Sequence, residues 1–426
     1  MRAWERPEIV SVPGESIAPW LHDTKTDSLV LARPLDAARL YVCGITPYDA
    51  THIGHANTYL AFDTLQRVWL DAGFRVHYAQ NVTDIDDPLL ERATATGVDW
   101  RDLAESQVEL FRTDMEALGI LPPHDFVAVT EVIDEVAAAV ALLQDAGLAY
   151  TVPTDDAIAG VDGTISADLY FDIRAAEAST EWKLGDESNL DVVSMLGLFA
   201  ERGGDPERAG KRDRLDPLLW KAARAGEPAW ESPVGAGRPG WHIECSVIAL
   251  KELGTDFTVQ GGGSDLIFPH HDMSAGHAQA LSGHPLAGVY SHTGMVAYQG
   301  EKMSKSLGNL VLVSRLRAQG IDPRAIRLAL LARHYRTDWE WTAAHLDEAV
   351  QRLSEWTAAF GTAAVSGTSA ETAGAAAALV QSLRVALRHD LDTPEALQLI
   401  DAVAAAPLDD PALVNRAISA LLGVAL

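Results

Sequence analysis

The sequence predicts an α/β fold in which a Rossmann-like parallel sheet carries a small inserted subdomain and a C-terminal α-helical domain. Three observations lead to this prediction. A strand, a loop, a helix and a second strand follow one another within residues 40–82, the stretch 150–235 is rich in Gly, Asp and short apolar runs, and the chain beyond residue 310 is helical in pattern and rich in alanine. Alternation of strands with helices is typical of a parallel sheet.

The first strand–helix–strand unit is predicted by changes in apolar periodicity. An apolar strand over residues 40–42 ends at Gly44, and residues 74–82 alternate as a second strand. Between them a helix is expected over residues 57–70, where apolar residues recur at helical spacing: Leu60, Phe62, Leu65, Val68 and Trp69. This is the opening of a parallel sheet.

The rest of the chain divides into further predicted segments. Residues 94–148 show a helical pattern that ends at a cap, Gly147. Residues 255–266 predict a strand and then a glycine-rich loop, residues 271–281 a helix, and residues 289–309 a strand that leads into a charged loop. The expected domains are two halves of the sheet domain at 1–148 and 236–310, the insert at 149–235 and the helical domain at 311–426.

Net charge and composition exclude several classes of protein. Sixty acidic residues against 33 basic ones give a formal charge of −27, which repels a polyphosphate backbone unless a local basic groove overcomes it. No window approaches the roughly 18 apolar residues that a membrane-spanning helix needs, and the N-terminus lacks the apolar core of a signal peptide. The sequence therefore predicts a cytoplasmic protein with no membrane partner.

A Thr-His-Ile-Gly-His motif occupies residues 51–55, in the predicted turn between the first strand and its helix. In an open α/β sheet, ligands bind beyond the carboxyl ends of the strands, and a helix N-terminus there favours phosphate. His52 and His55 add directional donors at that end, and Gly54 lets a nucleotide base approach the backbone. Taken alone, the motif is equally typical of two ordinary loop histidines.

A Lys-Met-Ser-Lys-Ser motif occupies residues 302–306, on a loop flanked by Gly300 and Gly308. Lys302 and Lys305 can close over a triphosphate and neutralise charge as pyrophosphate leaves. Taken alone, this motif also fits a solvated basic loop in an acidic protein.

Together the two motifs resemble the paired signature of the class I aminoacyl-tRNA synthetases, and their context resembles the cysteinyl-tRNA synthetase branch. The resemblance covers roughly residues 20–335, and the stretches that carry it follow the expected order: YVCGITPYDATHIGHANTYLAFD, NVTDIDD, DPLLWKAARAGEPAWESPVGAGRPGWHIECS, GGGSDLIFPHHD and EKMSKSLGN. The resemblance implies a nucleotide-binding domain that uses ATP with Mg²⁺, and it implies that the catalytic residues are His52, His55, Lys302 and Lys305.

The same resemblance implies further residues around the substrates. Asp265 is expected near the ribose hydroxyls, Gly263 and Ser264 against the nucleotide, and Ala297 facing adenine. The residues expected around the amino acid and its adenylate are Cys43, Gly44, Ile45, Thr46, Thr58, Asn81, Val82, Thr83 and Trp241.

Cys43 and Cys245 are the only cysteines, which excludes a disulfide framework and leaves a metal site or two inert thiols. Thiolates with an imidazole suit zinc. The resemblance implies that Cys43, Cys245 and His270 bind one Zn²⁺ per chain, which takes the thiolate of a substrate cysteine. Where the synthetases have a carboxylate ligand, this chain has Ser274, a feeble ligand that leaves a position open. The sequence assigns no role to His271, His277, His284 and His292.

Several positions depart from the synthetase pattern. Pro47 follows Thr46 where valine is usual, and Pro88 follows Asp87 where lysine is usual. Residues 201–210, ERGGDPERAG, form a Gly-rich stretch that is not associated with the synthetases. Residues 341–426 contain ten acidic residues, four arginines and no lysine, which argues against docking a polyanion.

In these departures the sequence resembles a related family, the mycothiol-pathway ligases of actinobacteria, which join cysteine to glucosaminyl-inositol (GlcN-Ins). The resemblance implies an enzyme that forms an amide bond between L-cysteine and the amine of GlcN-Ins through cysteinyl adenylate, with AMP and pyrophosphate as products. The expected partners are L-cysteine, ATP and GlcN-Ins, with tRNA not expected as a partner and a monomer favoured. A truncated cysteinyl-tRNA synthetase and an inactive nucleotide-binding paralogue are the alternatives.

Overall fold

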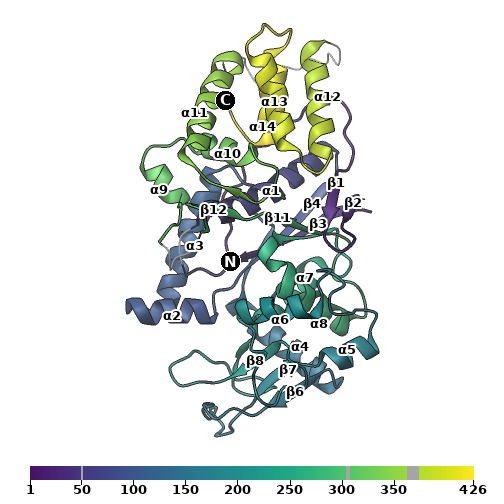
Figure 1. Ribbon diagram of the computed structural model, residues 1–426, viewed down its shortest axis with the longest axis vertical. Helices are drawn as coiled ribbons and strands as arrows, with labels where there is room; N and C mark the ends of the chain where they lie inside the picture. The colour runs from purple at the N-terminus through teal and green to yellow at the C-terminus, as the bar shows by residue number, and fades with distance from the viewer. Residues whose placement is uncertain (49–50, 304–307, 362–373) are drawn as a thin grey trace.

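A five-stranded parallel sheet forms the middle of the molecule, between a helical end and an end built on a second sheet (Figure 1). The structure, a computed structural model, describes residues 1–48, 51–303, 308–361 and 374–426. The strand order is β11-β10-β3-β4-β5, and every neighbouring pair is parallel. The strands are β3 (Ala37–Ile45), β4 (Arg75–Val82), β5 (Asp125–Ala128), β10 (Val259–Gly263) and β11 (Tyr290–Thr293). The predicted α/β fold is confirmed.

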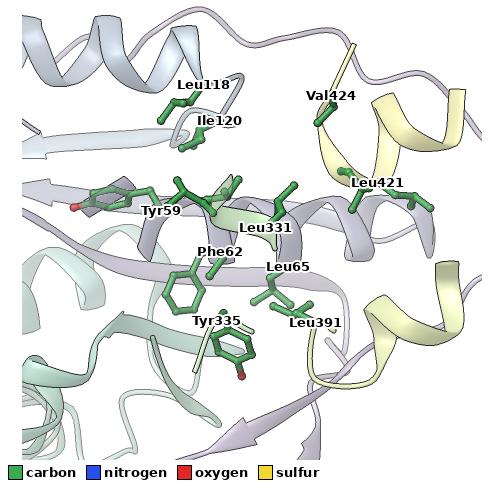
Figure 2. Close-up of a cluster of buried hydrophobic side chains, with 14 of the residues drawn as sticks. Tyr59, Phe62, Leu65, Leu118, Ile120, Leu331, Tyr335, Leu391, Leu421 and Val424 are labelled. Carbon is green, nitrogen blue, oxygen red and sulfur yellow. The ribbon is translucent and has the colours of Figure 1, made fainter. Parts of the chain in front are cut away.

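Helix α1 (Ile53–Asp71) packs against the sheet and is buried along most of its length. Its N-cap is His52, so the helix begins four residues before the predicted start. Figure 2 shows Tyr59, Phe62 and Leu65 of α1 among apolar side chains from distant segments, including Leu331 and Leu421. The predicted β-α-β unit is therefore present, and α1 joins the sheet to the C-terminal helices.

Strand β10 runs through the triple glycine, where the sequence predicted a loop. That prediction is wrong because the glycines permit close packing rather than a turn. A Cβ atom on Gly261 would lie 2.4 Å from the ring of Phe62 on α1, far inside van der Waals contact. Only glycine allows the strand and the helix to approach each other this closely.

The helical pattern predicted over residues 94–148 is wrong at one place, because β5 interrupts it. The observed elements are α2 (Asp87–Thr96), α3 (Trp100–Ala117), β5, a 3-10 turn (Val129–Glu131) and α4 (Ile133–Asp145). Pro122 and Pro123 cannot continue a helix, and the short run that follows them pairs with β4 at the sheet edge. Gly147 is left-handed, with a φ of 74°, as expected after a helix C-terminus.

The chain between α4 and α7 forms an antiparallel sheet of order β6-β7-β8-β9. Its elements are β6 (Ala149–Val152), β7 (Asp168–Phe171), α5 (Ile173–Ser179), α6 (Val192–Glu201), β8 (Leu218–Ala222) and β9 (Gly237–Pro239). Helix α7 (Trp241–Leu253) leads back to the central sheet, and a 3-10 turn (Ser264–Leu266) and a π turn (Ile267–His271) connect β10 to α8 (Asp272–Ser282). The remaining short strands are β1 (Trp20–Asp23), β2 (Ser28–Leu31), β12 (Val296–Tyr298), β13 (Glu301–Lys302) and β14 (Trp339–Glu340).

The C-terminal helices form the other end of the molecule (Figure 1). They are α9 (Val313–Ala318), α10 (Pro323–Leu331), α11 (Ala343–Phe360), α12 (Ala375–Arg388), α13 (Thr393–Ala404) and α14 (Pro411–Leu422). Three of them begin with an aspartate N-cap and a proline in the first turn, at Asp322, Asp392 and Asp410. Within the described ranges, no helix combines the length and apolarity that crossing a bilayer requires.

A buried charge cluster ties α1 to these helices. Asp63 accepts hydrogen bonds from Nε of Arg67 at 2.8 Å and from Nη2 of Arg327. Arg327 also donates to the carbonyl oxygens of Leu422 at 2.6 Å and Leu118 at 2.9 Å, where two other helices end. Burial acts to raise the pKa of Asp63, but the two arginines outweigh it and hold that pKa below its ordinary value. The carboxylate therefore stays ionised between the two arginines.

Replacing Arg327 with methionine tests this cluster. Arg327→Met leaves a fully buried carboxylate with one partner fewer, and we expect the free energy of unfolding to fall by about 3–5 kcal/mol. Urea denaturation measures the change. The control is Arg324→Met, which removes a half-exposed pair with Asp322 and should cost less than about 1 kcal/mol. Equal effects of the two substitutions would contradict the role given to the cluster.

Candidate active site

A cavity of about 540 Å³ opens where the carboxyl ends of β3 and β10 meet the N-terminus of α1. The strand order reverses between β3 and β10, and ligands bind at such a point in open α/β sheets. Its wall also includes Tyr48, Tyr59, Leu266, Met295 and Met303, to which the sequence assigned no individual role. The predicted site residues on its wall are Cys43, Gly44, Ile45, Thr46, His52, His55, Thr58, Trp241, Gly263 and Asp265.

Other predicted residues lie off the cavity wall. Asn81 is buried, its Oδ1 accepts from the backbone N–H of Gly44 at 2.8 Å, and its Nδ2 donates to Oγ1 of Thr83 at 3.0 Å. From the neighbouring strand β4, Asn81 therefore holds the end of β3 in place. Val82 is buried beside it, and Ser264 and Ala297 lie in the turn after β10 and in β12. Lys302 belongs to β13, and Lys305 lies outside the described residues.

His52 and His55 meet at the N-terminus of α1. Nδ1 of His52 accepts from the backbone N–H of Gly54 at 3.1 Å, and the two imidazole rings stack with centroids 3.9 Å apart. Burial lowers the pKa of His55 to about 4, and its Nδ1 has no hydrogen-bond partner among the described residues. His55 is therefore neutral near pH 7, and it offers the cavity a hydrogen bond beside a helix end that is already electropositive.

Cys43, Cys245 and His270 come together at the edge of this cavity. The two Sγ atoms and an imidazole nitrogen all lie within 4.8 Å of one another, and the three side chains are buried. The hydrogen bond from Cys43, with His270 adding to it, lowers the pKa of Cys245 well below its ordinary value. Burial, and then the interaction with Cys245, raise the pKa of Cys43. Two cysteine sulfurs and one imidazole nitrogen form a donor set that suits zinc, which binds cysteine as the thiolate.

Ser274 lies on the first turn of α8, close to this trio in sequence but engaged elsewhere. Its Oγ donates to the carbonyl oxygen of His242 at 3.2 Å, and Oγ of Ser246 donates to the carbonyl oxygen of Ser274 at 3.1 Å. These two bonds join α7 to α8, because the hydroxyl of each serine donates to a backbone carbonyl of the other helix. The hydroxyl of Ser274 therefore has a structural use in place of metal binding.

Sequence reasoning missed a row of buried histidines behind Cys43. Nε2 of His271 lies 3.3 Å from Sγ of Cys43, and Nδ1 of His271 lies 2.7 Å from Nε2 of His292. Nδ1 of His292 lies 2.6 Å from Oγ1 of Thr24, and Nδ1 of His242 lies 3.1 Å from Nδ1 of His270. The sequence left His271 and His292 without a role. In the structure His271 lies within hydrogen-bond distance of the sulfur of Cys43, and His292 lies within hydrogen-bond distance of His271. No signal in the sequence could show the β10–β11 register that brings them there.

Most of the chain, residues 33–351, matches the model of the tRNA synthetases class I (C) catalytic domain. Mycobacterium tuberculosis methionyl-tRNA synthetase in complex with methionyl-adenylate is similar in fold, with a TM-score of 0.59 at 18% identity, over 87% of this chain and 82% of that one. At this low identity, the likeness shows the fold alone.

A Clavibacter michiganensis subsp. michiganensis protein named L-cysteine:1D-myo-inositol 2-amino-2-deoxy-alpha-D-glucopyranoside ligase is 65% identical over 428 residues, 100% of this chain and 99% of that protein. The chain belongs to this ligase family. A ligase of the same name from Clavibacter sepedonicus is 67% identical over 91% of this chain and 94% of its own length. The predictions of an enzyme and of a ligase on an ATP-using synthetase fold are confirmed, and a truncated cysteinyl-tRNA synthetase is not favoured.

The buried histidines of the ligase predict how its stability depends on pH. Burial lowers the pKa of His55 to about 4 and the pKa values of His277 and His292 to about 3. In the unfolded chain each pKa is near 6.5, so below that pH the unfolded chain binds protons that the folded chain does not. Each histidine should therefore reduce stability by up to about 1.4 kcal/mol per pH unit as the pH falls below about 6.

His277→Leu isolates one of these contributions, because His277 packs edge-on against Phe171 and takes no part in the cavity wall. Between about pH 5 and pH 6, urea denaturation should show that the free energy of unfolding falls less steeply with decreasing pH in the variant than in the parent chain. The expected difference in slope corresponds to about one proton, or about 1.4 kcal/mol per pH unit. The same slope in both proteins would contradict a neutral His277.

Proposed function

We propose that the ligase joins L-cysteine to the amine of glucosaminyl-inositol through cysteinyl adenylate, releasing pyrophosphate and then AMP. The observation that carries this proposal is the position of Cys43, which belongs both to the trio with Cys245 and His270 and to the cavity that contains His52 and His55. Groups that bind sulfur and groups that bind phosphate therefore share one cavity. The names of the relatives, which contain L-cysteine and an amino-sugar inositol, support these substrates.

The trio would hold one Zn²⁺ per chain. Bound there, the ion would supply Lewis acidity toward the sulfur of L-cysteine. Ser274 does not compete for that position, because its neutral hydroxyl donates to the backbone of α7. An apolar pocket separates cysteine from serine or alanine poorly, whereas binding through sulfur rejects both.

In the first half-reaction, the carboxylate of cysteine attacks the α-phosphate of ATP and pyrophosphate leaves. The N-terminus of α1, with His52 and His55, donates hydrogen bonds to the phosphates, and Asp265 binds the ribose hydroxyls. Lys302 and Lys305 neutralise the charge on the departing pyrophosphate, and Mg²⁺ bound with ATP would add to that neutralisation. The chain contributes most by orienting the two reactants.

In the second half-reaction, the amine nitrogen of the acceptor attacks the acyl carbon of cysteinyl adenylate. A carbon–nitrogen bond forms, the bond from that carbon to the phosphate oxygen breaks, and AMP leaves. The attacking nitrogen must enter unprotonated and gives up a proton as the amide forms. The imidazoles of His52 and His55 at the start of α1 and the carboxylate of Asp265 lie on the cavity wall and are candidates to accept it.

We further propose that tRNA is not a partner, and that the ligase acts as a monomer in the cytoplasm. The formal charge of −27 and the ten acids and four arginines of residues 341–426 both oppose docking of a polyanion. In this proposal, residues 1–148 and 236–310 form the catalytic domain, residues 149–235 the insert and residues 311–426 the helical domain.

Cysteine-dependent exchange between ATP and pyrophosphate tests the first half-reaction. We expect exchange without any acceptor, because the adenylate forms before the acceptor attacks. Adding GlcN-Ins should then release AMP and form a cysteinyl amide, while adding tRNA should not form cysteinyl-tRNA. Absence of exchange would contradict the proposal, and transfer to tRNA alone would contradict the acceptor.

Zinc analysis tests the metal site independently of activity. Cys245→Ala removes the thiolate of the trio, and we expect the zinc content to fall from one equivalent per chain to a small fraction of that, with loss of exchange. Ser246→Ala is the matched control, because it alters the neighbouring buried position and leaves the trio intact. Stoichiometric zinc in Cys245→Ala would contradict the assignment.

A further inference from the structure

Arg202 reaches from the inserted sheet to the turn that carries two proposed functional residues. It follows α6 directly, at the start of the Gly-rich stretch 201–210. Its Nη1 donates to the carbonyl oxygen of Asp265 at 2.6 Å and to the carbonyl oxygen of Phe268. These carbonyls lie within the turn that begins at Ser264 and ends at His271, so one guanidinium contacts the backbone of the segment that contains Asp265 and His270.

The sequence of this turn explains why it needs an outside donor. In an α-helix the carbonyl of Asp265 would accept from the N–H of residue 269, but that residue is proline and has no N–H. Phe268 is extended, with a φ of −140° and a ψ of 138°, so the helical ladder is interrupted there as well. Arg202 supplies hydrogen bonds to both carbonyls, and bonds from a charged donor contribute more than neutral ones.

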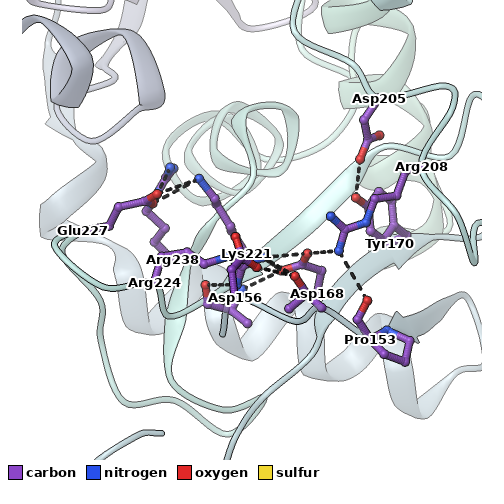
Figure 3. Close-up of polar contacts among 12 residues, drawn as sticks. Pro153, Asp156, Asp168, Tyr170, Asp205, Arg208, Lys221, Arg224, Glu227 and Arg238 are labelled. Carbon is purple, nitrogen blue, oxygen red and sulfur yellow. Dashed lines mark hydrogen bonds and ion pairs between the residues drawn. The ribbon is translucent and has the colours of Figure 1, made fainter. Parts of the chain in front are cut away.

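The loop after Arg202 is itself held firmly on the inserted sheet (Figure 3). The hydroxyl of Tyr170 on β7 donates to Asp205, and Nη2 of Arg208 donates to Oδ2 of Asp168 at 2.7 Å. Gly204 packs flat against Phe199, where a Cβ atom would lie 2.4 Å from the ring. Apart from Arg202, the contacts made here by this loop stay within the insert. Arg202 therefore links a loop that is held in place on the insert to the turn that runs from Ser264 to His271.

We propose that Arg202 is a positioning residue for the ligation reaction, which aligns Asp265 for the nucleotide and His270 for the metal at the same time. This inference rests on the proposed function, because that proposal assigns Asp265 and His270 their roles. Arg202 lies off the cavity wall, and in this proposal it acts through two backbone carbonyls. It also gives the stretch 201–210, which set this sequence apart from the synthetases, a use in the active site.

Arg202→Met keeps most of the side-chain volume and removes both hydrogen bonds. In cysteine-dependent ATP–pyrophosphate exchange, we expect the KM for ATP to rise about tenfold while kcat changes less than about threefold, and we expect the affinity for zinc, titrated with a competing chelator, to fall about tenfold. Arg202→Lys keeps a charged donor and should recover most of both losses. A purely structural role would lower the melting temperature without this KM-against-kcat split or the rescue.

Arg214→Met is the matched control, because Arg214 belongs to the same region and pairs only with the exposed Glu207 among the described ion pairs. It should leave the KM for ATP and the zinc affinity unchanged. If the parent chain exchanges and binds zinc but Arg202→Met has the parent KM and zinc affinity, the positioning role is wrong while the proposed function stands. If the parent chain itself shows no exchange, the proposed function fails instead.

Discussion

The candidate active site depends on the close contact of α1 with β10. A Cβ atom on Gly261 would lie 2.4 Å from the ring of Phe62, so a larger residue in the strand would push the helix away. Because β10 also pairs with β3 in parallel, with Gly261 opposite Val42, this contact brings the N-terminus of α1, the end of β3 and the turn after β10 to one point. Cys43, His52 and His270, which are far apart in sequence, meet for that reason.

The chain is strongly acidic overall, so its ability to bind ATP depends on the groups placed at the cavity rather than on its net charge. His55 is kept neutral by burial and stands at a helix N-terminus, so it can donate to a phosphate without being a cation. The thiolate of Cys245 is favoured by the hydrogen bond from Cys43 and by His270. The arginines that are most deeply buried, such as Arg327, are used to join helices and do not reach the cavity.

The sequence predicts those parts of the fold and site that rest on local pattern. The first β-α-β unit follows from apolar periodicity, and the trio was implied by the resemblance of the motifs around its residues to those of the cysteinyl-tRNA synthetases. Contacts set by tertiary packing were not predictable: β5 is a four-residue edge strand within a helical pattern, and the triple glycine was taken for a loop because its partner, Phe62, lies two hundred residues away. The row from His271 to His292 depends on strand register, and the reach of Arg202 depends on how the insert folds back.

We propose that the trio would hold a zinc ion to which the sulfur of the substrate binds. X-ray absorption at the zinc edge, recorded on the zinc-loaded ligase with and without L-cysteine, measures this directly. We expect two sulfur ligands without substrate, three when L-cysteine is added and no change with L-serine. Two sulfur ligands in the presence of saturating L-cysteine would contradict this proposal.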